Sequence, residues 1–280
     1  VFRKMKLQFY NSITSEKEEF KPISNNEVLV YGCGPTVYNA PHIGNFRTFV
    51  FYDLINRVLM QNGYTVRNVI NITDIDDKII DRINNENVTF DDLTKKYERL
   101  FLDQSALLNI LPSTINPRAS EYISDMIDFI KSLIEKGVAY EVNGNIFFDT
   151  KAYKKYGKFV NIDDENLSTE DDELGKRHPN DFALWKAWKE SDGQITWKSD
   201  WGNGRPAWHT ECAVLGTELL GKSIDIHCGG IDLKFPHHEN ESAQVEALLG
   251  NKFANYWLHA EHLIFDSEKM SKSLGNTLDI

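Results

Sequence analysis

The sequence has no long hydrophobic run and very little cysteine. No apolar segment approaches the ~20 residues that a membrane-spanning helix needs, so we expect no membrane association. Residues 1–6 also lack the apolar core of a signal peptide. Cys33, Cys212 and Cys228 lie far apart and are odd in number, which excludes a disulfide framework and favours a reducing, cytoplasmic location.

Positive charge is also scarce. The chain has 31 Lys and Arg against 42 Asp and Glu, a formal net charge of −11. Such acidity argues against a nonspecific nucleic-acid binder, so an RNA partner would have to meet local basic runs such as 154–155 or 176–178. With 280 residues, the chain is long enough for one large domain or two moderate ones.

Hydrophobic spacing near the N-terminus predicts a strand, a loop, a helix and a second strand. Residues 27–31 are apolar and β-branched, and Gly32 follows them. Apolar residues recur at helical spacing within 46–62 and stop before Gly63. A second strand is expected at 65–72. This is the first βαβ unit of a parallel sheet, with a right-handed crossover.

The middle of the chain differs in character from its two ends. The acidic run 163–172 is expected to be a mobile loop, and residues 182–208 carry five tryptophans. The other elements that we expect are two helices, a hairpin and two strands, at 78–109, 119–136, 137–150, 224–227 and 257–265. We therefore predict an α/β fold with a doubly wound, Rossmann-like parallel sheet, split by an insertion of roughly ninety residues.

Two short segments are candidates for binding the phosphates of a nucleotide. The first places His42, Gly44 and Asn45 where a helix begins, and free backbone N–H groups and the helix dipole favour phosphate there. The second holds Lys269 and Lys272 in a loop that can bring ammonium groups to a pyrophosphate leaving group. Read alone, the first is also typical of a structural histidine and the second of a solvated basic loop.

Together the two segments resemble the paired signatures of class I aminoacyl-tRNA synthetases, H-I-G-H and K-M-S-K-S. The second matches in full, and the first matches in three of four positions, with Asn45 in place of the usual second histidine. The resemblance implies that His42, Asn45, Lys269 and Lys272 stabilise the phosphates of ATP together with Mg²⁺. It also implies that Gly44 and Lys272 contact ATP.

Within this class, the sequence is most similar to the cysteinyl-tRNA synthetases, nearly from end to end. The matching stretches are 20–23, 33–38, 71–78, 204–212 and 235–241. The resemblance implies that L-cysteine is activated with ATP to cysteinyl-adenylate and transferred to the 3′ end of tRNA(Cys). We expect a monomer.

Residues within or beside these stretches are candidate metal ligands. His237 and Glu241 are four apart and share a face if a helix begins there. Cys33 ends a strand at the carboxyl edge of the sheet, where ligands bind in such folds. Together with Cys212 they make a plausible zinc set. Judged by residue type alone, the rival ligands are His209, His238, Cys228 and Glu239.

The family resemblance narrows this choice to one Zn²⁺ per chain. It selects as ligands Cys33, Cys212, His237 and Glu241. It further implies that the substrate thiolate binds the zinc and that Thr73 and Trp208 grip the amino acid. A metal that prefers sulfur would separate cysteine from serine, which an apolar pocket discriminates by only ~100-fold.

The glycine turn after the strand at 224–227 is a further candidate. Gly230 could admit the adenine of ATP, and Asp232 could accept hydrogen bonds from the ribose hydroxyls. A turn with a capping aspartate explains the same residues equally well.

The resemblance also predicts how the chain is divided. Residues 21–112 and 205–262 would form the split catalytic domain, 113–204 an inserted connective-peptide domain, and 263–280 the mobile lysine loop with the start of a stem-contact region. A C-terminal anticodon-binding domain is expected to be absent from this chain.

Two rival functions remain open at this point. One is a cysteine ligase of the same fold that acts on an amino sugar, as in mycothiol biosynthesis; residues 71–78 and the insertion favour the synthetase over it. The other is a nonenzymatic zinc- or nucleotide-binding paralogue, against which the intact lysine loop argues.

Overall fold

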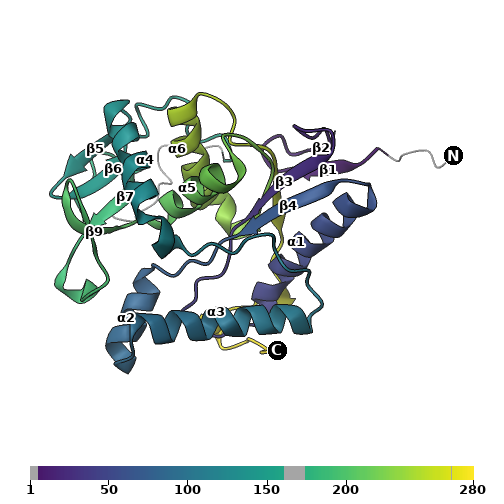
Figure 1. Cartoon of the computed structure of the whole chain (residues 1–280), viewed down its shortest axis with the longest axis horizontal. Coiled ribbons are helices and arrows are strands. Elements are labelled where there is room, and N and C mark those ends of the chain that lie inside the picture. Colours follow the sequence, from purple (N-terminus) through teal and green to yellow (C-terminus); the bar gives the residue numbers. More distant parts are fainter. Residues whose placement is uncertain (1–5, 161–173, 266) are drawn as a thin grey trace.

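A parallel sheet of four strands forms the centre of the molecule. The computed structural model describes residues 6–160, 174–265 and 267–280 (Figure 1). The strand order is β11-β10-β3-β4, and every pair is parallel. In that order, the strands span Ala254–Ala260, Ile224–Gly230, Glu27–Gly32 and Thr65–Ile70. The chain leaves β3 and β10 toward opposite edges of the sheet, so the order reverses between these two strands, where such sheets bind ligands.

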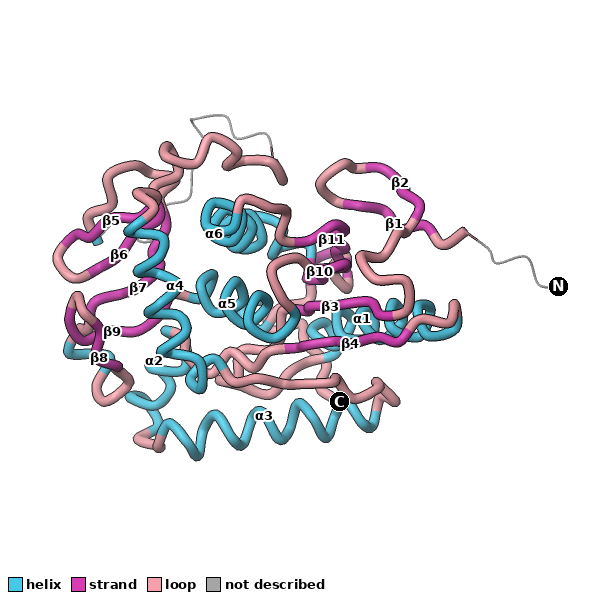
Figure 2. Tube along the Cα trace, turned by 45° about the horizontal axis from the view of Figure 1, so that its top comes forward, coloured by secondary structure: helices cyan, strands magenta, loops and turns pink. Residues whose placement is uncertain are grey.

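Helices cover both faces of this sheet (Figures 1 and 2). Helix α1 (Ile43–Gln61) connects β3 to β4, and its apolar stripe packs on the face that carries Val30. Helices α5 (Trp208–Leu220) and α6 (Glu239–Leu249) pack on the face that carries Tyr31. Strand β3 is accordingly apolar from Val28 to Tyr31. Strand β10 also carries Asp225 and His227, which are buried and have polar partners.

A second sheet, antiparallel and five-stranded, lies on the left of Figure 1 beside helix α4 (Ile123–Glu135). Its order is β5-β6-β7-β9-β8, with bounds Ala139–Val142, Asn145–Phe148, Phe182–Ala187, Gly202–Pro206 and Trp197–Ser199. Trp185 and the apolar face of α4 form its buried core. The sheet falls mostly within the predicted insertion, 113–204, and the boundaries of that insertion stay a prediction.

Smaller elements complete the described chain. They are β1 (Gln8–Asn11), β2 (Glu16–Glu19), α2 (Asp77–Glu86), α3 (Phe90–Leu107), β12 (Ile264–Phe265), β13 (Glu268–Lys269) and the short helical turns at 119–122, 190–192, 231–233, 234–238 and 272–274. In the part of the chain described by the structure, no helix is both long and apolar enough to cross a membrane.

Several predicted boundaries are wrong. The single helix expected at 78–109 is two helices, because Asn87 adopts the left-handed conformation (φ 54°) and Thr89 caps the start of α3. The strand expected at 257–265 is β11, which ends at Ala260, followed by the separate short strand β12. The loop predicted at 163–172 lies outside the described residues.

Candidate nucleotide cleft and metal centre

A cleft of about 500 Å³ opens at the carboxyl ends of β3 and β10, where the strand order reverses. The predicted site residues that line it are Cys33, His42, Gly44, Asn45, Trp208, Gly230, Asp232, Lys269 and Lys272. The two signature segments, far apart in sequence, therefore meet at one cavity. Thr73 does not line the cleft, because it is fully buried. Its role in gripping the amino acid stays a prediction.

His42 and Asn45 cap the start of α1 reciprocally. His42 Nδ1 accepts the backbone N–H of Asn45 at 3.3 Å, and Asn45 Oδ1 accepts the backbone N–H of His42 at 3.1 Å. Burial, with help from the charge of Lys272, lowers the pKa of His42, which favours a neutral ring. Because Nδ1 is an acceptor, the ring proton lies on Nε2. The His42 ring and the Asn45 amide nitrogen are therefore both donors.

At the start of α1, the backbone N–H groups of Ile43 and Asn45 are not free to bind phosphate. The prediction assumed free backbone N–H groups at the start of α1. Instead, the N–H of Ile43 donates to the carbonyl of Leu278 at 2.9 Å, and that of Asn45 is taken by His42. The physical reason is that residues 278 and 279 lie across the start of the helix. There Asp279 forms an isolated antiparallel β-bridge with His42.

The lysine loop also makes internal contacts. Lys269 Nζ lies 3.0 Å from Asp232 Oδ2, so two groups predicted to bind ATP pair with each other. Lys272 Nζ donates to the carbonyl of Ala40 at 2.5 Å, and burial lowers its pKa. The Asn276 amide closes the loop by bonding the backbone of Ser271 and Lys269, at 2.8 and 3.1 Å. Phosphate binding would therefore replace existing contacts of both lysines.

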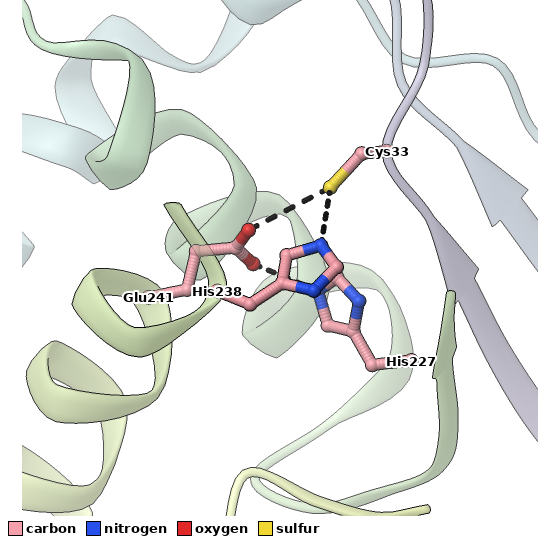
Figure 3. A group of neighbouring side chains, drawn as sticks. All are labelled: Cys33, His227, His238 and Glu241. Carbon is pink, nitrogen blue, oxygen red and sulfur yellow. Dashed lines mark hydrogen bonds and ion pairs between the residues drawn. The ribbon is translucent and has the colours of Figure 1, made fainter. Parts of the chain in front are cut away.

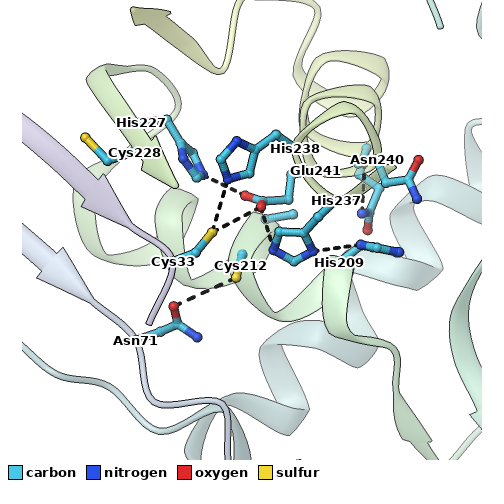
Figure 4. Close-up of polar contacts among 12 residues, drawn as sticks. Cys33, Asn71, His209, Cys212, His227, Cys228, His237, His238, Asn240 and Glu241 are labelled. Carbon is cyan, nitrogen blue, oxygen red and sulfur yellow. Dashed lines mark hydrogen bonds and ion pairs between the residues drawn. The ribbon is translucent and has the colours of Figure 1, made fainter. Parts of the chain in front are cut away.

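The four predicted zinc ligands lie together beside the cleft (Figure 4). Each offers one ligand atom, these atoms all lie within 4.8 Å of one another, and all four residues are buried. Cys33 follows β3, Cys212 comes from α5, and His237 stands in the turn before α6. The expected contact across one helical turn is present, since His237 Nε2 lies 2.9 Å from Glu241 Oε1.

A second group of four overlaps the first (Figure 3). It shares Cys33 and Glu241 and adds His227 and His238. His227 Nε2 lies 2.7 Å from Glu241 Oε2, and His238 Nε2 lies 3.3 Å from the Cys33 sulfur. His238 was predicted as a rival ligand. His227 was not, because it lies inside β10, in a run whose pattern indicates only a strand.

The other rival ligands have different partners. His209 Nδ1 lies 2.8 Å from His237 Nδ1, and burial keeps the pKa of His209 well below its usual value, so His209 is the neutral acceptor. Glu239 accepts two backbone N–H groups, of Gly157 and Phe159, both at 2.8 Å. Among the described residues, neither of these two nor Cys228 belongs to a group that could hold a metal ion.

The first group has the charge that a cation site requires. Burial opposes ionisation of Cys212, but the hydrogen bond with Cys33 and the nearby His237 lower its pKa to about 6. Burial also disfavours charge on Glu241, yet His227 and His237 lower its pKa to about 2. Against burial, Glu241 and Cys212 raise the pKa of His237 to about 10. Two anions thus face one imidazolium and a thiol, and a divalent ion bound here would take the place of protons.

Comparison with known proteins shows the family to which the chain belongs. The family model described as "tRNA synthetases class I (C) catalytic domain" matches residues 19–280. The chain belongs to this family.

Curated relatives carry the name Cysteine--tRNA ligase. The one from Brachyspira hyodysenteriae is 50% identical over 274 residues, which is 96% of this chain and 58% of the relative. The one from Thermococcus gammatolerans is 48% identical over 279 residues, which is 99% of this chain and 58% of the relative. The chain therefore spans about 58% of the length of these relatives.

A solved structure extends the comparison to the fold. Mycobacterium tuberculosis methionyl-tRNA synthetase in complex with methionyl-adenylate matches with a TM-score of 0.68 at 15% identity. The match covers 91% of this chain and 60% of that chain. The predicted α/β fold with a Rossmann-like parallel sheet is confirmed.

One residue to which the sequence analysis gave no role connects several parts of the site. Asn71 is fully buried; its Oδ1 accepts the backbone N–H of Gly34 at 2.8 Å, and its Nδ2 donates to Thr73 Oγ1 at 3.0 Å. Oδ1 also lies 3.9 Å from the Cys212 sulfur. A Cβ on Gly34 would lie 1.5 Å from the backbone oxygen of Asn71, so only glycine fits. Asn71 thus fixes the turn that contains Cys33 and Gly34, and it places this turn next to helix α5.

Removing the Asn71 amide should destabilise this turn. We expect Asn71→Ala to lower the free energy of unfolding by about 1–3 kcal/mol, because it leaves the partly buried N–H of Gly34 and the buried hydroxyl of Thr73 without partners. The matched control is Asn62→Ala, which removes a hydrogen bond to Val58 at a less buried helix end and should cost less than about 0.5 kcal/mol. Urea unfolding measures both, and equal losses would contradict the role given to Asn71.

Proposed function

We propose that this chain activates L-cysteine with ATP and transfers it to the 3′ end of tRNA(Cys). The observation that carries the proposal is that Cys33 belongs both to the metal-binding group and to the wall of the nucleotide cleft. Trp208 adds a second link, since it lines the cleft and stacks on His237 with ring centroids 4.0 Å apart. The names of the curated relatives support the same substrates.

The chain's own residues would act on ATP by position and charge. The cysteine carboxylate attacks the α-phosphorus, and pyrophosphate leaves; no covalent enzyme intermediate is needed. His42 and Asn45 face the cleft as hydrogen-bond donors, and Lys269 and Lys272 supply positive charge once their internal contacts open. Asp232, freed from Lys269, would accept from the ribose, with Mg²⁺ bound to the phosphates.

Zinc fits the first of the two groups, which consists of Cys33, Cys212, His237 and Glu241. Two thiols, an imidazole and a carboxylate converge within 4.8 Å, and the ionised Cys212 is a soft donor. When bound, the ion would supply a preference for the thiolate of cysteine over the hydroxyl of serine. His209 would keep the proton of His237 on Nδ1, which directs Nε2 toward the metal.

The amino-sugar ligase would share both the cleft and the metal group, so the geometry of these two sites does not separate the two functions. The similarity of the chain to relatives named for tRNA charging favours the synthetase. A monomeric state and a cytoplasmic location stay predictions.

The zinc-loaded chain should catalyse ATP–pyrophosphate exchange that depends on cysteine. Serine should support it at least ~100-fold less well. Lys272→Ala should slow exchange by about 100- to 1000-fold, because it removes a positive charge that stabilises the leaving pyrophosphate. Lys252→Ala, at an exposed residue outside the cleft, is the control and should leave the rate unchanged. Absence of exchange in a folded, zinc-loaded sample would refute the proposed function.

Metal analysis should give close to one zinc per chain. Cys212 belongs to one of the two overlapping groups and His227 to the other, so single variants decide between them. We expect Cys212→Ser to weaken zinc binding at least 10-fold and His227→Asn to weaken it less. Cys228→Ser is the thiol control. In the cobalt-substituted protein, cysteine and not serine should raise the sulfur-to-metal charge-transfer band; an unchanged spectrum would mean that selectivity lies elsewhere.

A further inference from the structure

The hairpin β1–β2 docks on strand β11 at the edge of the parallel sheet (Figure 2). Asn11 holds it there, since its Nδ2 donates to the carbonyl of Asn255 at 3.0 Å and its Oδ1 accepts the backbone N–H of Trp257 at 3.1 Å. The next residue, Ser12, is buried, and its backbone N–H donates to the carbonyl of Trp257 at 2.9 Å. Backbone contacts therefore fix the position of Ser12 and leave its hydroxyl available for another partner.

That hydroxyl begins a row of contacts that ends at a candidate metal ligand. Ser12 Oγ lies 2.7 Å from His259 Nδ1, and His259 Nε2 lies 2.8 Å from His238 Nδ1. His238 Nε2 in turn lies 3.3 Å from the Cys33 sulfur (Figure 4). Two imidazole rings thus connect the N-terminal hairpin to the sulfur at the end of β3.

Both rings in this row are neutral. Burial, with help from the nearby His227, holds the pKa of His238 well below its usual value and lowers the pKa of His259 to about 3. A neutral imidazole has one N–H donor and one acceptor nitrogen. Once the direction of one hydrogen bond in the row is fixed, the directions of the other two follow.

Glu241 fixes that direction. The Cys33 thiol donates to Glu241 Oε1 at 3.6 Å, and an ionised carboxylate is a stronger acceptor than a neutral imidazole. The sulfur must then accept from His238 Nε2, so His238 Nδ1 accepts from His259 Nε2. His259 Nδ1 is left as an acceptor, and the donor that it faces is the hydroxyl of Ser12. A Cys33 thiolate would require the same direction, because it has no proton to donate.

We propose that Ser12 is a positioning residue of the metal centre. Its hydroxyl donates to His259 and thereby holds the proton of His238 on Nε2, where it faces the Cys33 sulfur. An N–H directed at a ligand sulfur stabilises the negative charge that the sulfur carries when it binds a metal. The inference rests on the proposed function, in which this sulfur is a zinc ligand. The hairpin thus supports the metal centre although none of its residues lines the nucleotide cleft.

Two substitutions of similar size separate the hydroxyl from the shape of the side chain. We expect Ser12→Val to weaken zinc binding by about 3- to 10-fold, less than the loss of a direct partner of a ligand because two rings intervene. Ser12→Thr, which keeps the hydroxyl, should stay within about two-fold of the unsubstituted chain. The control is Thr14→Val, which removes an exposed hydroxyl of the same hairpin that donates to Glu18. Competition with a chelating dye measures all three, and equal affinities of the two Ser12 variants would overturn the proposal.

The positions of the ring protons can be measured without zinc and without a substitution. In the zinc-free chain labelled with ¹⁵N-histidine, long-range ¹H–¹⁵N correlation spectra should place the proton on Nε2 of both His238 and His259. Ser12→Val should shift the Nδ1 resonance of His259, and Ser12→Thr should restore it. A proton on Nδ1 of either ring, in a chain that binds zinc and catalyses exchange, overturns this inference alone. If the expected protons are found but the unsubstituted chain binds no zinc, the proposed function fails instead.

Discussion

The buried carboxylate of Glu241 is the contact on which the rest of the site depends. One oxygen lies 2.9 Å from His237 and the other 2.7 Å from His227, and the Cys33 thiol donates to it at 3.6 Å. A buried carboxylate that lost such partners would cost several kcal/mol, so these contacts must form together. They join the end of β3, the interior of β10 and the turn before α6. The position of the candidate metal ligands relative to the strand ends follows from this one side chain.

Much of the fold could be predicted because its signals are local. The apolar run at β3 and the helical spacing of α1 are typical of a βαβ unit, and both elements are present. The break between α2 and α3 was missed because a single asparagine in the left-handed conformation interrupts a continuous helical pattern. The hairpin β1–β2 has four-residue strands of largely charged and polar composition, so hydrophobic periodicity gave no signal there.

The candidate site, like the fold, could be predicted from the sequence only in part. Cys33, Cys212, His237 and Glu241 were predicted through a family resemblance, and the structure brings them together. His227 lies inside β10 and Asn71 directly after β4, and both were missed because their partners come together only after the sheet has formed. The contact of residues 278 and 279 with the start of α1 was missed for a similar reason, since sequence patterns do not reveal where a loop returns.

The internal pairing of the cleft makes ligand binding an exchange. Lys269 is paired with Asp232, and Lys272 is bonded to Ala40. A ligand gains only the difference in free energy between its own contacts and those it displaces. Its apparent affinity equals its affinity for the open cleft multiplied by the fraction of molecules that are already open. The Lys269 pair is about half exposed and is worth at most ~1 kcal/mol, so it opens readily. A ligand that reaches either lysine must compensate the contact that it breaks there, so the resting cleft selects against groups that are weak hydrogen-bond acceptors.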